Sequence, residues 1–187
     1  INTTEYPQYA FLLNELKNWD GKGDADSKGA GFFLLAYNHL SKLLAGQASR
    51  RITMPESIST YKAVHDYMMK NFGGTDLVLG DILKLVRGNK EFPLSGFPDL
   101  LSPQWAEPQK NGTLKSIGGD AYIAFVRFVK DGLPLIESVN MYGASSKPGN
   151  KHFDDQVPLY LEQKTKKMTL DKAEVYKNAE RIYHPGQ

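Results

Sequence analysis

The sequence predicts an α+β fold in which helices pack on a small antiparallel sheet. Apolar residues recur at helical spacing through the first part of the chain, which is typical of amphipathic helices. Two β-branched and aromatic runs, residues 122–129 and 135–142, flank the turn signal Asp131-Gly132 and predict a β-hairpin. Hydrophobic residues make up 41% of the 187 positions, which is enough for a folded core and argues against disorder.

One domain, or one large piece of a bigger domain, fits this length. The first helix should follow the apolar series from Tyr9 to Trp19 and end at Gly21 and Gly23. We expect a single segment, residues 1–187, in three parts: 1–88 mainly helical, 89–163 loops and the hairpin, and 164–187 a terminal helix.

A second helix should begin soon after these glycines. Asp26 or Ser27 can cap it, because a short polar side chain can accept a hydrogen bond from the first backbone N–H groups. Residues 45–59, which follow this helix, are polar and predict a loop. The inward face of the helix should carry Ala30, Phe33, Leu34, Tyr37, Leu40 and Leu44.

A third helix should run from near Ser59 to Phe72 and stop at Gly73-Gly74. Asp76 can cap a short fourth helix that continues to Val86, although Ile82–Val86 is equally consistent with a strand. The inward side chains of the third helix should be Tyr61, Val64, Met68 and Phe72.

The remaining segments are predicted from turn residues and apolar runs. Residues 89–119 carry many loop-forming residues and predict an irregular segment that Phe92, Phe97 and Trp105 pin down. The apolar run 122–129 predicts a strand buried on both faces. Residues 143–151 should form a loop, and the Lys164–Lys167 cluster a solvated surface. Thr169 should cap a last helix, ended by Pro185-Gly186, with Leu170, Ala173, Tyr176 and Ala179 on one face.

Charge and composition exclude several classes of function. The net charge is +2, from 23 basic and 21 acidic residues, so we expect neither a nucleic-acid partner nor an anionic membrane surface. No apolar run approaches the roughly 20 residues that span a bilayer. The absence of cysteine excludes disulfides, thiolate nucleophiles and zinc–thiolate sites. We expect no cofactor and no metal.

Short motifs that would suggest local chemistry are weak. Ser59-Thr-Tyr-Lys62 matches S-x-x-K, the start of a serine penicillin-binding site, but the S-D-N element is missing. Lys115-Ser-Ile-Gly118 departs from K-T-G at its third position. A pattern with two fixed positions arises readily by chance in a chain of this size, so we favour coincidence. Chance also explains the glycosylation sequons at Asn2 and Asn111.

The stretch His152-Phe-Asp-Asp155 groups an imidazole with two carboxylates. A metal site would need further ligands from elsewhere in the chain. The alternative is a hydrogen-bonded histidine and aspartate that hold a loop in place, and we favour it.

Five stretches, in this order, resemble the penicillin acylase family, which includes the acyl-homoserine lactone acylases. They are Trp19-Asp-Gly21, Asp26-Ser-Lys-Gly-Ala30, Gly118-Gly-Asp-Ala-Tyr122, Tyr142-Gly-Ala-Ser-Ser146 and His152-Phe-Asp-Asp-Gln156. The family often has Ser where Ala121 stands, and Gln where Ala144 stands. The candidate motif residues, to which we assign a structural role, are Trp19, Asp20, Gly119, Asp120, Tyr122, Tyr142, Gly143, Ser145, His152, Asp155 and Gln156.

The resemblance implies an N-terminal-nucleophile hydrolase with a four-layer αββα core, of which this chain would be a portion. In that family a precursor cuts itself to free a Ser at the start of the β subunit, and this Ser attacks an amide carbonyl with its own α-amino group as base. Those residues precede the W-D-G motif, and Ile1 has neither a hydroxyl nor a thiol. We therefore expect no catalytic residue in this chain and no activity when it is isolated.

Two interpretations follow from the resemblance. In the first, the chain is the C-terminal structural part of a periplasmic or secreted bacterial acylase that cleaves the linear amide of a small N-acyl compound. Its partners would then be the α subunit and the N-terminal part of the β subunit. In the second, the chain is a stand-alone binding or scaffold module of the same ancestry without catalytic function.

Overall fold

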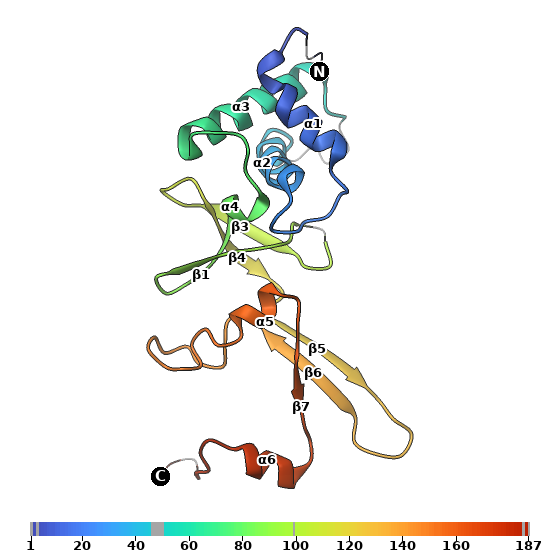
Figure 1. Cartoon of the computed structure of the whole chain (residues 1–187), viewed down its shortest axis with the longest axis vertical. Coiled ribbons are helices and arrows are strands. Elements are labelled where there is room, and N and C mark those ends of the chain that lie inside the picture. Colours follow the sequence, from blue (N-terminus) through green and yellow to red (C-terminus); the bar gives the residue numbers. More distant parts are fainter. Residues whose placement is uncertain (1, 3, 46–50, 99, 185, 187) are drawn as a thin grey trace. The chain divides into compact units, whose positions relative to one another are not determined.

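The computed structural model describes residues 2, 4–45, 51–98, 100–184 and 186. The chain forms two compact units, residues 1–119 and residues 120–187, which are described separately below (Figure 1). Residues 89–119 belong to the first unit, because strands up to Gly119 pair with one another and pack with the helices of that unit. That the whole chain is one segment of a larger acylase stays a prediction.

The first unit begins with helices. These are η1 (Pro7–Tyr9), α1 (Ala10–Asn18), α2 (Lys28–Leu43), α3 (Met54–Phe72) and α4 (Leu79–Ile82). Ser27 caps α2, as predicted, and its side chain accepts a hydrogen bond from the Ala30 N–H. Gly73 ends α3, also as predicted, with a left-handed φ of 76° that a glycine adopts without steric cost.

The predicted loop 45–59 is wrong where it meets α3, which begins at Met54. Thr53 and Glu56 form a capping box: each side chain accepts a hydrogen bond from the other residue's backbone N–H. The prediction overlooked this pair, with Pro55 in the first turn, because the segment is polar. Residues 46–50 of the predicted loop lie outside the described residues, as do Ile1 and Pro185.

Four strands complete the first unit, so the prediction of an irregular segment over 89–119 is wrong. They are β1 (Leu83–Arg87), β2 (Lys90–Pro93), β3 (Gln104–Pro108) and β4 (Leu114–Gly119), in the sheet order β2-β1-β4-β3. β1 runs parallel to β4 and the other pairs are antiparallel. The prediction missed these strands because each is short and its partners are fixed by tertiary contacts.

The strand alternative for Ile82–Val86 is nearly correct, since β1 spans Leu83–Arg87. Asp76 does not cap α4. Val78 precedes that helix, and the Val78 N–H donates to the Asp81 carboxylate.

The core of the first unit lies between the helices and this sheet. α2 contacts α1, α3 and α4, and α4 contacts β1 and β2. Phe32, not Phe33, is the buried aromatic residue of α2, and Phe33 and Tyr37 are exposed. α2 is buried on more than one side, so the single inward stripe that the sequence suggested is wrong at these two positions. The largest fully buried side chains of this unit include Leu12, Phe32, Met68, Leu79, Ile82, Leu83, Leu85 and Leu94.

The second unit contains the predicted hairpin. Its elements are β5 (Tyr122–Arg127), β6 (Leu135–Asn140), α5 (Val157–Leu161), β7 (Lys166–Met168) and α6 (Lys172–Asn178), with the sheet order β5-β6-β7. β5 and β6 pair antiparallel, as the sequence predicts, and their register places Ile123 opposite Val139. The predicted basic cluster is exposed, but part of it forms β7.

Two predictions for this unit are wrong. The strand 122–129 is not buried on both faces, since Phe125 is 64% and Phe128 84% exposed. The last helix is capped by Asp171, whose carboxylate accepts from the Glu174 N–H, and not by Thr169. Thr169 instead accepts a hydrogen bond from the Asp171 N–H just before the helix.

Within the described residues, no helix is both long enough and apolar enough to span a bilayer.

Candidate functional site

The motif residues near the start of the chain form a packed corner between α1 and α2. Trp19 lies against Gly29 of α2 so closely that a Cβ at position 29 would be 2.5 Å from the Trp19 Cβ. The Trp19 ring packs near Phe33 and Phe97, with centroids 5.0 and 5.9 Å away. Its indole N–H donates to the Lys22 carbonyl oxygen over 2.8 Å. The role of Trp19 is therefore to join two helices and a loop.

Asp20 holds the turn that follows Trp19. Its carboxylate accepts from the Lys22 N–H at 3.0 Å and pairs with the Lys22 ammonium at 3.1 Å. The hydrogen bond from the Lys22 backbone N–H is the main reason that the pKa of Asp20 lies below its usual value. Gly21 follows with φ +80°, a left-handed conformation that suits glycine. Asp20 is solvent-exposed and directed at its own turn.

Gly119 allows β3 and β4 to approach each other closely at the end of the first sheet. Its φ is +157°, and a Cβ there would be 2.3 Å from the Pro103 carbonyl oxygen. Asp120 follows β4 directly and is half-buried. Tyr122 begins β5, is 55% exposed, and directs its hydroxyl to the Met168 sulfur at 3.6 Å.

The loop from Tyr142 to Gln156 is closed by its own backbone. The Ser145 N–H donates to the His152 carbonyl oxygen at 2.9 Å, and the Gln156 N–H donates to the Tyr142 carbonyl oxygen at 3.1 Å. At Gly143 a Cβ would be 2.3 Å from the His152 carbonyl oxygen and 2.7 Å from an Asp155 carboxylate oxygen. Only glycine therefore fits where the two arms of the loop meet.

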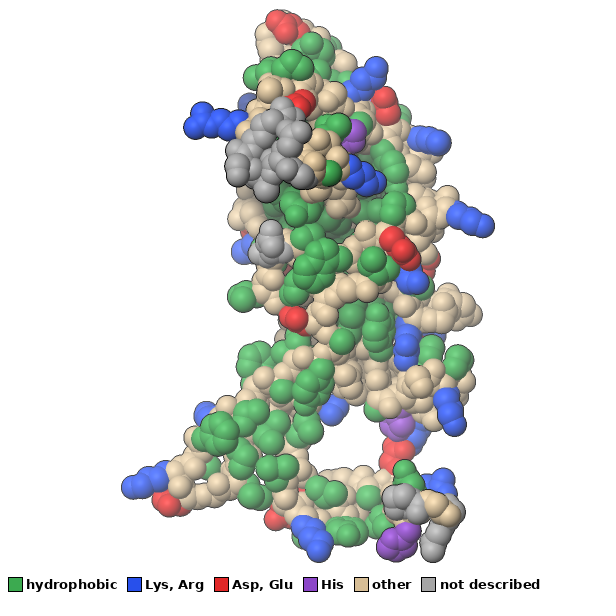
Figure 2. All heavy atoms as spheres, turned by 180° about the vertical axis from the view of Figure 1, so that it is seen from behind, with side chains coloured by type: hydrophobic (Ala, Val, Ile, Leu, Met, Phe, Trp, Pro, Cys, Tyr) green, Lys and Arg blue, Asp and Glu red, His purple; other side chains and the backbone are tan. Residues whose placement is uncertain are grey.

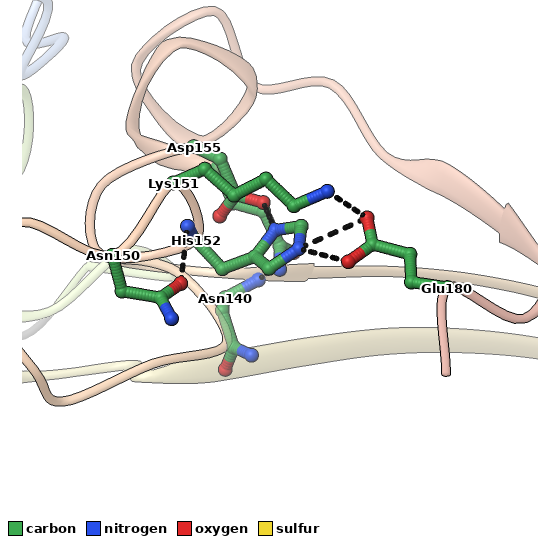
Figure 3. Close-up of polar contacts among 7 residues, drawn as sticks. Asn140, Asn150, Lys151, His152, Asp155 and Glu180 are labelled. Atoms are coloured by element: carbon green, nitrogen blue, oxygen red, sulfur yellow. Dashed lines mark hydrogen bonds and ion pairs between the residues drawn. The ribbon is translucent and has the colours of Figure 1, made fainter. Parts of the chain in front are cut away.

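His152 joins this loop to the segment after α6 (Figure 3). Its Nδ1 lies 2.6 Å from the Asp155 Oδ2, and its Nε2 lies 3.1 Å from both oxygens of Glu180. The Lys151 ammonium contacts the same Glu180 carboxylate at 2.6 Å. A fifth residue, Asn150, accepts from the His152 N–H at 2.8 Å. Both imidazole nitrogens are thus directed at carboxylates.

This arrangement favours the protonated imidazole. The hydrogen bond to Asp155, followed by that to Glu180, raises the pKa of His152 above its usual value. In turn Lys151, followed by His152, lowers the pKa of Glu180. An imidazolium with two carboxylate partners has no free nitrogen to act as a general base. Within the described part of the chain, no group of three or more His, Asp or Glu side chains could hold a metal ion.

Gln156 supports the hairpin from inside. Its side-chain oxygen accepts from the Asn140 N–H at 3.0 Å, and Gln156 is only 6% exposed. Asn140 is the last residue of β6, so this bond satisfies a backbone group at the point where the strand leaves the sheet. The amide of Gln156 is thereby used in the structure of the loop.

The S-x-x-K stretch has no catalytic geometry. Ser59 and Lys62 are exposed residues of α3, and the Ser59 hydroxyl donates to the Glu56 carbonyl oxygen at 2.9 Å. The stretch that was compared with the K-T-G motif, Lys115–Gly118, lies within β4. The structure thus gives no support to a serine penicillin-binding site here.

Sequence reasoning missed three partners of the motif residues. Glu180 lies 28 residues from His152, and Gly29 lies ten residues from Trp19, so neither contact is visible in a local pattern. Asn140 lies at the end of a strand, and nothing in the sequence around it indicates that its backbone N–H donates to the side chain of Gln156.

The motif residues described above support backbone, loop and helix contacts. Residues 2–177 match the family described as penicillin amidase. The chain belongs to this family. The penicillin amidases are amidohydrolases of the acylase type, which act on carbon–nitrogen bonds other than peptide bonds. The two small sheets with their helices form an α+β fold that is consistent with a portion of a penicillin amidase domain.

Proposed function

We propose that this chain is the C-terminal structural portion of an acylase that hydrolyses the linear amide bond of a small N-acyl compound. Water is added across the amide, so that the products are a carboxylic acid and an amine. The substrate would be of the penicillin or acyl-homoserine lactone type. Family membership supports the reaction class.

The contacts of the motif residues support the proposed structural role, because these residues pack and form hydrogen bonds within the fold. Trp19 closes a helix corner, Gly143 lets two loop arms meet, and Gln156 satisfies a strand-end N–H. His152 is held between two carboxylates. In the proposed enzyme the nucleophilic Ser, its α-amino base and the oxyanion donors belong to the remainder of the acylase.

The exposed hairpin supports the same proposal. Figure 2 shows hydrophobic side chains gathered over the β5–β6 hairpin. The side chains of Phe125, Phe128, Leu133 and Leu135 are each at least 50% exposed. Contiguous exposed apolar surface of this kind marks a surface that a partner covers. We propose that the remainder of the acylase covers it.

The test compares the purified chain with the same chain expressed together with the remaining acylase. Penicillin G, a cephalosporin and an acyl-homoserine lactone are offered, and release of the free amine is followed by chromatography. We expect no release by the chain alone and release by the complete enzyme. Release by the chain alone, abolished by Ser59→Ala, would overturn the proposal in favour of a serine–lysine enzyme.

The alternative is a stand-alone binding or scaffold module of the same ancestry. The reading frame upstream of this chain decides between the two. A Gly-Ser junction preceded by an α-subunit sequence supports the acylase, and a signal peptide at its start supports the proposed periplasmic or secreted location. An upstream frame that lacks such a junction favours the module.

A further inference from the structure

The first unit contains a cleft that the acylase proposal does not use. It has a volume of about 490 Å³ and lies between α2, α3 and the β3–β4 pair. Pockets for small molecules commonly measure about 300–1,000 Å³ and have mostly apolar walls. The size of this cleft therefore suits a small organic ligand.

The walls of the cleft are apolar. Leu35, Val64 and Leu114, one each from α2, α3 and β4, are 7%, 2% and 3% exposed. Ala63 and Ala106 add small side chains from α3 and β3. Because these residues come from different elements of one packed unit, the cleft is formed by the fold and does not depend on the conformation of a single loop.

Of the described residues that line the cleft, Lys42 carries the one formal charge, which is positive, and His39 adds an imidazole beside it. Lys42 is exposed and His39 half-buried, and both come from α2. Among the lining residues that the structure describes, none is acidic, and no acidic side chain in the described ranges pairs with either group. Tyr67 stays neutral, because burial raises the pKa of its hydroxyl, which donates to the Gly112 carbonyl oxygen at 2.7 Å.

We propose that this cleft binds a small molecule with one carboxylate and an apolar body. The apolar body would lie between Leu35, Val64 and Leu114, and the carboxylate would face Lys42 and His39 at the solvent side. An ammonium ion bound to a carboxylate makes a charge-assisted hydrogen bond, which an alcohol or an amine cannot reproduce. The inference does not rest on the proposed acylase function.

The test uses three ligands that share one alkyl chain and differ in their head group: octanoate, octanol and octylamine. Isothermal titration calorimetry on the complete chain at neutral pH measures each affinity. We expect octanoate to bind most tightly and octylamine most weakly. Lys42→Gln should weaken octanoate about fivefold, since a partly exposed charge contributes modestly, and should leave octanol unchanged. Lys62→Gln, an exposed lysine of α3 that does not line the cleft, is the matched control.

A second variant tests the position of the apolar body. Ala63→Trp fills the cleft and should abolish binding of octanoate and octanol alike, while circular dichroism reports whether the unit is still folded. Equal affinity for octylamine and octanoate would overturn the proposal, as would octanoate binding that neither Lys42→Gln nor Ala63→Trp affects. A chain that binds octanoate but also releases amine by itself would overturn only the acylase proposal, and an inactive chain that does not bind octanoate would overturn only the cleft proposal, so the two proposals fail separately.

Discussion

The two units of the chain place their large apolar side chains differently. In residues 1–119, helices and sheet enclose Leu12, Phe32, Met68 and Leu85, each with at most 1% exposure. Among the described residues of 120–187, the buried apolar side chains are Val139, Met141, Val157 and Tyr160. The hairpin residues Phe125, Phe128 and Leu135 remain exposed, and no residue of α6 is buried.

This difference shows what stabilises each unit. Burial of apolar surface dominates folding where a core exists, so residues 1–119 owe most of their stability to the packed core between helices and sheet. Residues 120–187 bury less and rely more on hydrogen bonds within the loop 142–156. Both tryptophans, Trp19 and Trp105, lie in the first unit. Tryptophan fluorescence therefore reports on one unit only, which makes the comparison testable.

The largest effect is expected for Phe32→Ala. Phe32 is 1% exposed, and its ring centroid lies 4.8 Å from that of Tyr61. Removing a buried phenylalanine ring leaves a cavity and should lower the free energy of unfolding by about 3–5 kcal/mol. Urea unfolding followed by tryptophan fluorescence measures this change. A loss below about 1 kcal/mol would show that the first unit has no tightly packed core.

Gly143→Ala should destabilise the second unit. The added Cβ would overlap the His152 carbonyl oxygen, so the loop must shift, at a cost of about 1–3 kcal/mol. Amide NMR signals of Ser145 and His152 should move, while tryptophan fluorescence unfolding stays as in the unmodified chain. Gly149→Asn is the control, since its site is open and Asn tolerates positive φ. If Gly143→Ala also shifted the unfolding transition that tryptophan fluorescence follows, the two units would not unfold independently of each other.

Gln156→Ala tests whether the motif loop is structural. It leaves the Asn140 N–H without its partner, which should cost about 1–3 kcal/mol. In the complete acylase this variant, and Asp155→Ala, should lower yield, melting temperature or self-processing, while kcat of the mature enzyme stays near normal. A fall in kcat of about a thousandfold at unchanged melting temperature would place the segment in the active site.

Local sequence signals predicted those parts of the fold that depend on neighbouring residues. Ser27 as a cap, Gly73 as a stop and the Asp131-Gly132 hairpin are confirmed, because each depends on residues a few positions apart. The strands of residues 83–119 depend instead on the parallel pairing of β1 with β4, which local sequence does not reveal.

The motif residues show the same limit. The sequence located His152 and Asp155 together, three residues apart, and their contact is confirmed at 2.6 Å. It did not reveal that Lys151 and His152 would both contact Glu180, because that contact is set by the path of the chain through β7 and α6. The prediction of a strand buried on both faces is wrong for a related reason: an apolar strand can be buried only where another element packs on it, and the described residues leave Phe125 64% exposed.

The His152 cluster should give a small, pH-dependent effect in the second unit alone. The pKa of His152 is raised in the folded chain. Its contribution to the free energy of unfolding is therefore complete at a pH below its pKa in the unfolded chain, near 6.5, and is lost as the pH rises through its pKa in the folded chain. NMR titration of the His152 ring should give a pKa above 6.5. Glu180→Gln should lower that pKa, whereas Glu162→Gln, whose partner is Lys164, should not change it. A His152 pKa at or below the usual value would show that the contact to Glu180 does not persist in solution.

The smallest effect on stability is expected for Phe125→Ala, which makes the same change as Phe32→Ala at an exposed site. Phe125 is 64% exposed, so its removal should alter the free energy of unfolding by no more than about 0.5 kcal/mol. Circular dichroism in urea, with the tyrosines of residues 120–187 as a second probe, measures this. The same variant should reduce self-association in analytical ultracentrifugation, because it removes apolar surface that the chain leaves uncovered. A stability loss as large as that of Phe32→Ala would show instead that the hairpin packs within the chain in solution, and the contrast between the two units would then be wrong.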